Sequence, residues 1–580
     1  DLQVQFQAAL PGLMQLLPQA GANISSGAVE ATAHITQKEQ TQTVAGTFTL
    51  TALTGRVGKN KFQNFGATAS LDATNNAGQI QISRLAGQLT GDGTAGGNFQ
   101  ITGNCDLDKK SGQLAFKLAD FNESGLRPFL EPLLAGKKLV SVAINADASA
   151  QFDLQNDDSV KADLQMTSLV VSDPGKFPAT PLEAKVHLDV SASKQVADLR
   201  QLQVTLTPTS RAQNELQLAG SVDFSKTNAI AGNLKLAANA LDMTRYYELF
   251  GSQTKAVGTA PSSSAATGTV VTNANQEPAA MNLPFGNFTV DADIGRFYLE
   301  EVDVSNLQAT VKLDGSRVTV NPFQLFLNGA PVKANVDLNL GLPGYQYDVS
   351  ANADRIPIAP LANSFSPAYK DKAKGDLLFN VQVKGTGITG ASLQKNLSGD
   401  ASLVITNGDI QLVGPKAKAF IASIARVAML AGLSGMGELT NSTLNRLDVQ
   451  LQMGDGKISL TRCLALAGAF RVIVTGDLPI APVLNDSPFN DWPIHIAIGN
   501  GSASNPNALS DAGYAKLPTF VMLEGTLGNP KVGSPLLKAG AKAVTTATSK
   551  IKSWFENTET NQSGTNAPSG HHLFDFFKKK

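Results

Sequence analysis

The sequence predicts a mainly β protein: an elongated, curved antiparallel β-sheet groove built of repeats, with a few short helices. Three observations support this fold class. Apolar and polar residues alternate with a period of two through most of the chain, turn sequences separate the alternating runs, and helical patterns are few and short. Side chains in a strand point alternately to opposite faces, so this alternation indicates sheets with one apolar and one polar face. Parallel strands covered by helices read instead as continuous apolar runs.

The alternation is clearest at residues 288–294 (FTVDADI), where every second residue is apolar. The same pattern covers residues 140–154, 332–340, 379–383, 447–453 and 494–498. Turn sequences lie between such runs, as hairpins require: Asp314-Gly315, Asn407-Gly408-Asp409 and Gly454-Asp455-Gly456. By this criterion we expect roughly 25–30 strands.

Four short segments have a helical pattern: residues 10–17, 125–134, 242–250 and 358–365. Their central residues Leu13, Phe129, Tyr247 and Leu361 are separated by 116, 118 and 114 positions. A short helix followed by a block of strands, repeated about four times, predicts an elongated array. Two longer helices are expected at residues 415–433 and 535–555.

The composition excludes several classes of protein. The 47 Lys and Arg nearly cancel 48 Asp and Glu, so no basic field is available to bind nucleic acid. Two cysteines exclude a disulfide scaffold and a Cys-rich metal protein, and whether Cys105 and Cys463 pair stays open. The longest apolar run, residues 419–433, is too short for a membrane span and contains Arg426.

We expect four parts in the chain. Residues 1–250 form N-terminal β-groove repeats, truncated at the start because DLQVQF already alternates and no signal peptide precedes it. Residues 251–284 are rich in Gly, Ser, Thr, Ala and Pro and predict a flexible, dispensable linker or loop. Residues 285–545 form a C-terminal β region with a helix near 415–433, and residues 546–580 contain a helix end and a polar tail.

No catalytic or cofactor-binding constellation is found. The G-x-G-x-x-G stretches at residues 91–96 and 385–390 lack the strand-then-helix context that pyrophosphate binding needs, so we interpret them as turn glycines. Ser392 and Lys395 have S-x-x-K spacing without the partner motifs of that chemistry. The five histidines show no metal-ligand spacing. We therefore expect no enzyme, no cofactor and no metal site.

So many one-faced strands leave a large apolar surface to cover. Sheets packed on each other, closed barrels, or a long trough that holds an apolar ligand would each cover it, and periodicity does not choose among them.

The C-terminal part resembles the AsmA family. Gly385-Thr-Gly387, the Leu393 and Leu397-Ser-Gly399 region and the Asn407-Gly408-Asp409-Ile410 stretch are similar to that family's signature. The hairpin at residues 447–460, the strand at 470–478 and the closing segment at 520–532 follow in the same order. The segments at residues 297–323 and 353–361 are similar to the family's repeats more loosely.

The resemblance implies a curved β-sheet groove in the envelope of a diderm bacterium, reaching into the periplasm from an inner-membrane anchor. That anchor would be an N-terminal segment not present in this chain. It also implies transport of phospholipid or another acyl lipid between the membranes, in outer-membrane biogenesis; no nucleic acid is expected, and protein partners stay unknown.

From the alternation, nine residues are candidates for the apolar lining of a lipid groove: Val142, Ile144, Val332, Val336, Leu338, Val381, Val383, Val449 and Leu451. Burying an acyl chain is favourable by about 0.8 kcal/mol per CH2, so such a groove needs no polar ligating residue. The alternative is a structural or adhesive β-repeat protein of the cell envelope whose apolar faces pack only on each other, in a dry core.

Overall fold

The computed structural model describes residues 1–16, 21–134, 136–153, 157–172, 180–250, 276–411, 422, 443–467, 470–499, 514–516 and 521–533. The chain divides into two units. The first contains residues 1–270 and 280–342, and the second contains residues 271–279 and 343–580. Strands β14–β17 therefore pack with the N-terminal strands. The fold is mainly β, in an unclosed, curved sheet with few short helices, as the alternation predicts.

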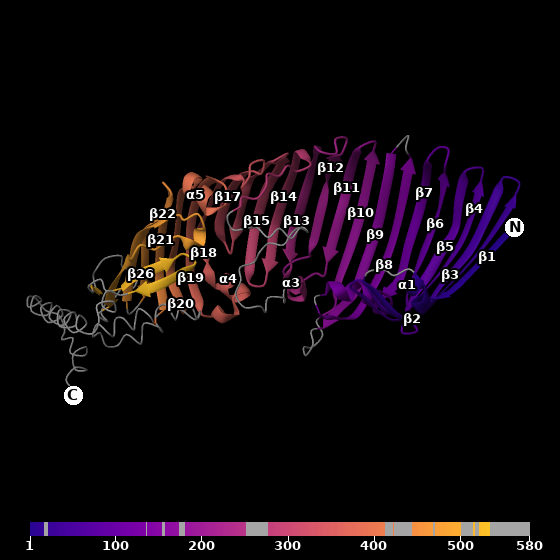
Figure 1. The fold of residues 1–580 in the computed structure, drawn as a ribbon, viewed down its shortest axis with the longest axis horizontal. Coiled ribbons are helices and arrows are strands. Elements are labelled where there is room, and N and C mark those ends of the chain that lie inside the picture. Colours follow the sequence, from indigo (N-terminus) through magenta and orange to yellow (C-terminus); the bar gives the residue numbers. More distant parts are fainter. Residues whose placement is uncertain are drawn as a thin grey trace, which may run out of the picture. The chain divides into compact units, whose positions relative to one another are not determined.

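The first unit contains seventeen described strands, which follow one another in chain order (Figure 1). Each of them is hydrogen-bonded to the next. Their bounds are β1 Leu2–Ala9, β2 Ala22–Lys38, β3 Thr41–Val57, β4 Asn60–Asn76, β5 Gln79–Gly91, β6 Thr94–Asp106, β7 Ser111–Asn122, β8 Lys138–Asp153, β9 Asp157–Ser172, β10 Leu182–Ser193, β11 Val196–Leu206, β12 Glu215–Asp223, β13 Ile230–Asp242, β14 Phe285–Leu299, β15 Val302–Asp314, β16 Arg317–Leu327 and β17 Ala330–Asn339.

Ten described strands belong to the second unit. Their bounds are β18 Gln346–Pro357, β19 Ala373–Thr386, β20 Ser398–Gln411, β21 Thr443–Gly454, β22 Lys457–Ala467, β23 Phe470–Pro479, β24 Trp492–Gly499, β25 Tyr514–Lys516, β26 Val521–Thr526 and β27 Asn529–Gly533. Strands β18–β24 pair antiparallel in chain order, and β24 also pairs with both β25 and β26. The total of 27 described strands falls within the expected number.

All four short helices form where the sequence predicts them. They are α1 Leu10–Leu16, α2 Glu123–Leu130, α3 Thr244–Phe250 and α4 Ile358–Phe365. A single-turn 3-10 helix, Glu131–Leu133, extends α2, and α5 Gly390–Asn396 is the short helix after the second glycine stretch. Six strands separate α1 from α2 and six separate α2 from α3, which is the predicted repeat. An even number of antiparallel strands returns the chain to the same end of the sheet.

Two of the three predicted hairpin turns are confirmed, and one prediction is wrong. Asp455 and Gly456 both have positive φ in the two-residue turn between β21 and β22, as a type I′ turn requires. Asp314-Gly315 joins β15 to β16. Asn407-Gly408 is instead a bulge inside β20, where the pairing shifts between Ile405 and Ile410. A Cβ atom at Gly408 would lie 2.6 Å from the Leu444 carbonyl oxygen, so the close strand explains this glycine.

The connection between β13 and β14 differs from the others because these two strands are parallel, with Ile230 opposite Phe285 and Asp242 opposite Tyr298. The chain leaves β13 at one end of the sheet and enters β14 at the other end. The residues between Asp242 and Phe285 thus have to join the two ends of the sheet. That residues 251–284 are dispensable stays a prediction, and the parallel pairing sets a minimum length that this connection needs.

The predicted helices at residues 415–433 and 535–555 lie outside the described residues, apart from residue 422, and so does the tail at residues 546–580. Within the described part, no helix is long and apolar enough to cross a membrane. Cys105 and Cys463 are both free thiols, which answers the question of their pairing.

Candidate functional site: a two-faced sheet with an uncovered apolar surface

The strand register assembles one continuous apolar row across the first unit. Residues directly opposite each other on paired strands lie on the same face, so the row can be followed from strand to strand. It contains one residue from each strand, all of them apolar: Val4, Ala33, Gly46, Leu71, Leu85, Ile101, Phe116, Ala148, Ala162, Leu188, Leu202, Leu218, Leu236, Ala292, Ala309, Phe323 and Ala334. We call this face the apolar face.

The adjacent row, on the opposite face, is polar at nearly every position. Its members are Gln5, Thr32, Thr47, Ser70, Ala86, Gln100, Lys117, Asp147, Asp163, His187, Gln203, Gln217, Ala237, Asp293, Gln308, Gln324 and Lys333. A shift of one residue in any pairing would place polar side chains in the apolar row. The register therefore keeps the two faces chemically distinct over seventeen strands.

The apolar face of the first unit is open to solvent in its middle rows. Phe48 on β3 is 41% exposed, Phe116 on β7 is 36% exposed, and Val160 and Leu164 on β9 are 40% and 36% exposed. Isolated exposed apolar residues are common on proteins, but contiguous apolar patches usually mark a binding surface. The described residues do not cover these side chains with a second sheet.

Within the described part of the first unit, helices α1, α2 and α3 cover the apolar face along one end. Leu53, Phe62 and Phe65 form a buried cluster against Leu10, the first residue of α1. The Phe129 ring of α2 packs edge-on against the rings of Phe62 and Phe65, with distances of 5.8 and 6.0 Å between ring centroids.

A second cluster joins Leu134, Leu139, Val142, Val171, Leu182 and Tyr246 beside α2 and α3. The Tyr246 hydroxyl donates to the Glu183 carbonyl oxygen at 2.7 Å.

Gly96 and Gly125 allow α2 to approach β6. A Cβ atom at Gly96 would lie 2.5 Å from the Gly125 Cα atom, so neither position accepts a side chain. The glycines at the start of the same stretch form the β5–β6 turn, where Asp92 and Gly93 have positive φ. The first G-x-G-x-x-G stretch is thus explained by a turn and a helix contact, as expected from the strand that follows it.

The second unit has an apolar face of the same construction. One row follows the register from β18 to β26: Ala353, Phe379, Leu403, Val449, Cys463, Val474, Ile494 and Val521. Leu403, the third member of this row, is 36% exposed, whereas Ala353 at its start and Ile494 and Val521 at its end are buried, at 7%, 2% and 0%. Burial in the apolar surroundings raises the pKa of the Cys463 thiol, and the Asp448 carboxylate adds to that effect, so this thiol stays protonated at neutral pH.

The nine predicted lining residues all lie on the apolar side of their strands, but one of them, Val142, is buried in the core. Val332, Val336 and Leu338 pair with Leu325, Val320 and Val318 in the first unit. Ile144 pairs with Met166 on the same face.

Val142 is only 2% exposed inside the cluster beside α2 and α3, so it is a core residue with no free surface.

The other four predicted residues lie on the apolar face of the second unit: Val381, Val383, Val449 and Leu451. Four exposed members of the face, Phe48, Phe116, Leu164 and Leu403, are not among the nine predicted lining residues. Phe48, Phe116, Leu164 and Leu403 have the same alternation in their own strands, so the pattern identified their side of the sheet. Their exposure depends on what lies above the face, which local periodicity does not encode.

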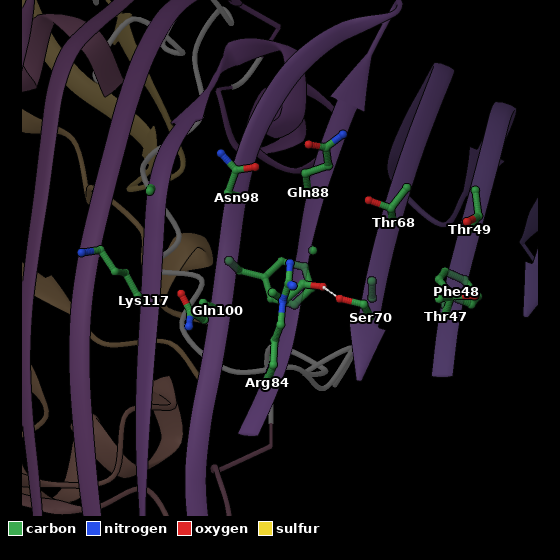
Figure 2. A pocket seen from close by; sticks show the side chains of 15 residues that line it. Thr47, Phe48, Thr49, Thr68, Ser70, Arg84, Gln88, Asn98, Gln100 and Lys117 are labelled. Carbon is green, nitrogen blue, oxygen red and sulfur yellow. Dashed lines mark hydrogen bonds between the residues drawn. The ribbon is translucent and has the colours of Figure 1, made fainter. Parts of the chain in front are cut away.

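The polar face carries a shallow hollow of about 540 Å³ over β3–β7 (Figure 2). Neutral hydrogen-bonding side chains such as Thr68, Gln88 and Gln100 line it together with Arg84 and Lys117.

Charges elsewhere on this face pair across neighbouring strands, for example Lys161 with Asp189 at 3.1 Å. The paired guanidinium of Arg317 lowers the pKa of the Asp337 carboxyl by hydrogen bonding. Exposed ion pairs of this kind add at most about 1 kcal/mol each to the free energy of unfolding. Their main effect is to keep this face polar and hydrated.

These features define a class of protein: an open antiparallel β-sheet that separates one polar from one uncovered apolar face. The model of the AsmA family matches residues 182–463, which confirms the resemblance seen in the sequence. The family is associated with the cell envelope. The motifs at residues 470–478 and 520–532 lie beyond the matched part. No curated protein and no solved structure matches the chain.

Proposed function

We propose that this protein is a non-enzymatic envelope protein whose apolar face shields the acyl chains of phospholipid or another acyl lipid. Its role would be lipid transport between the inner and outer membranes, or outer-membrane biogenesis. The observation that carries the proposal is the uninterrupted apolar row from Val4 to Ala334 on a face that is partly open to solvent. The match of residues 182–463 to an envelope-associated family is consistent with this role.

The physical basis is the burial of hydrocarbon without specific contacts. Removing a CH2 group from water is favourable by about 0.8 kcal/mol, so complete burial of a sixteen-carbon chain gains roughly 12 kcal/mol. A sheet covers an acyl chain from one side only, so we expect about half of this gain in free energy. Because each step along the row offers a similar apolar contact, a bound chain would find neighbouring positions of similar free energy, which favours movement along the face.

The proposal places the protein in the periplasm of a diderm bacterium, held at the inner membrane as the family resemblance implies. Fractionation of cells tests this part. Recovery in the membrane fraction, with release of the folded domain by an external protease after the outer membrane is opened, is expected. Recovery in the cytoplasmic fraction would contradict it.

Photo-crosslinking tests the lipid-binding face with neighbouring positions of opposite orientation. A benzoylphenylalanine at Phe116 lies in the apolar row, and one at Lys117 lies in the polar row of the same strand. Lipid adducts, identified by mass spectrometry of protein purified from cells, are expected at position 116 and not at position 117.

Equal labelling at the two positions contradicts a face-specific interaction. An absence of adducts at position 116 in folded protein, together with no co-purified lipid by native mass spectrometry, favours the structural β-repeat protein with a dry core. The two neighbouring positions share one strand and one expression background, so differences in yield or folding cannot produce the expected result.

A further inference from the structure

The second glycine-rich stretch, Gly385-Thr-Gly387-Ile-Thr-Gly390, surrounds a carboxylate of the chain itself. The Ile388 N–H donates to Oε2 of Glu277 at 2.9 Å, and the Thr389 N–H donates to Oε1 at 3.1 Å. The Thr389 hydroxyl donates to the same Oε1 at 2.5 Å. Partial burial raises the pKa of the Glu277 carboxyl, but hydrogen bonds from Ile388, Ser392 and Thr389 outweigh it and lower this pKa to about 2. Four donors therefore converge on one carboxylate.

The glycines on either side of the carboxylate leave the space that it fills. A Cβ atom at Gly344 would lie 2.1 Å from Oε2 of Glu277, and one at Gly387 would lie 2.7 Å from Oε1. Both residues have φ near +80°, a conformation that favours glycine. The remaining glycines of the stretch have packing reasons: Gly385 lies against the Tyr347 ring, and Gly390 lies against the Ala481 carbonyl oxygen. Each of these glycines is thus explained by a close contact, either with the Glu277 carboxylate or with a neighbouring ring or backbone oxygen.

Residues 276–284 then continue from Glu277 into β14 through backbone contacts. The Met281 N–H donates to the Leu340 carbonyl oxygen at 2.8 Å, and the Leu283 N–H donates to the Gly315 carbonyl oxygen at 3.1 Å. The Ile230 N–H donates to the Pro284 carbonyl oxygen at 2.9 Å, directly before the parallel pairing of β13 with β14 begins. Among the described residues of this segment, Glu277 is held by its side chain at a point eight residues before β14.

We propose that the Gly385–Thr389 turn is an anion receptor whose ligand is the chain's own Glu277 carboxylate. The contact anchors the end of the long connection from β13, eight residues before β14. Ordering a chain segment costs conformational entropy, and the charge-assisted hydrogen bonds to the Glu277 carboxylate offset part of that cost.

The isosteric change Glu277→Gln separates an anion receptor from simple packing. A glutamine fills the same space but presents one oxygen and one NH2 group. Its oxygen can replace Oε1, which accepts two hydrogen bonds from Thr389, and its NH2 group then faces the Ile388 N–H, a donor against a donor. An anion receptor therefore loses the Ile388 contact first, whereas a site that only packs the side chain is unaffected.

Amide hydrogen exchange of the full chain, resolved to single residues by mass spectrometry, tests the proposal. In Glu277→Gln the Ile388 amide should exchange at least about tenfold faster, with a smaller change at Thr389, since a hydrogen bond to a charged group is worth that much. The Met281 and Leu283 amides should also exchange faster, because the anchor of their segment is weakened. The control Glu39→Gln, at an exposed carboxylate in the β2–β3 turn, should change none of these rates.

An unchanged Ile388 rate in Glu277→Gln overturns the receptor. A faster Ile388 amide with unchanged Met281 and Leu283 amides overturns the anchoring role. If Glu277→Gln does not fold, Ser392→Ala deletes one donor to the carboxylate and leaves the rest. It should accelerate the Ile388 and Thr389 amides by a smaller factor than the full change, and no acceleration in that variant also overturns the proposal.

Discussion

The apolar face of the first unit is open, whereas the corresponding face at the end of the second unit is buried. Phe116 and Val160 of the first unit are 36% and 40% exposed, while Ile494 and Val521 of the second are 2% and 0% exposed. Both regions have the same two-residue alternation in sequence, as 114–120 (LAFKLAD) and 492–498 (WPIHIAI) illustrate. Alternation therefore determines which side of a sheet a residue takes, and not whether that side is covered.

The difference separates two uses of the same pattern. A covered apolar side chain contributes to folding stability through area removed from water. An uncovered one contributes little to folding and remains available to a ligand, which gains that same free energy on binding. We therefore expect equivalent substitutions in the two regions to affect different properties of the protein.

The largest effect is expected in the first unit, from removing residues 251–275. The β13–β14 pairing spans about twelve residues, or roughly 40 Å at 3.3 Å per residue. The nine residues 276–284 reach at most about 32 Å. The shortened chain must therefore unwind α3 and withdraw Tyr246 from its cluster, or lose part of the β14 pairing.

Denaturant unfolding and amide exchange at β13 and β14 measure the loss caused by this deletion. A ten-residue deletion within the same stretch is the control, since it leaves enough chain to cross the sheet. Unchanged stability of the longer deletion would contradict the crossing connection.

Truncation of core-facing side chains should distinguish the two regions next. Ile494→Ala removes a fully buried side chain and should lower the free energy of unfolding by about 2–5 kcal/mol. Phe116→Ala removes a larger side chain from the open face and should cost clearly less than Ile494→Ala, because Phe116 is already 36% exposed. Chemical denaturation of the two variants is the measurement. A cost for Phe116→Ala equal to that of Ile494→Ala would mean that the open face is covered in solution.

The Glu277 carboxylate makes the second unit sensitive to acid. Its pKa in the folded protein is lowered from 4.5 to about 2. Its contribution is therefore fully present above about pH 4.5 and is lost as the pH falls towards 2, because protonation favours the unfolded chain. After allowance for its partial exposure, we expect about 1–2 kcal/mol. Unfolding curves of wild type and Glu277→Gln should differ at pH 7 and converge near pH 2, and a constant difference between them would contradict this.

The smallest effect on stability is expected from charges placed on the two faces of β17. Asn335→Asp adds a charge to the polar face and should change stability by less than about 0.5 kcal/mol. Val336→Asp places a carboxylate in the apolar face beside Val320 and should obstruct lipid capture, because an unpaired charge would face hydrocarbon. The amount of co-purified lipid per folded protein is the measurement, with Asn335→Asp as the matched control. Equal lipid content in the two variants would show that β17 does not take part in lipid binding.

Several features of this protein follow from the sequence alone. Alternation is a local property of neighbouring residues, so it identified the strands, their two faces and the apolar phase of Val332, Val336 and Leu338. Helical spacing identified the four short helices for the same reason. The glycine stretches were recognised as structural because no helix of the required kind follows them, and the family resemblance came from the order of short motifs.

Only the tertiary structure decided the features that depend on residues far apart in the chain. The core position of Val142 requires Tyr246, and the bulge at Gly408 requires the neighbouring Leu444 backbone. Glu277 meets Ile388 across 111 residues. The parallel β13–β14 pair likewise has no local signal, since a strand has the same alternation in either direction. Contacts of this kind depend on which surfaces the folded chain brings together, and periodicity within one strand carries no information about them.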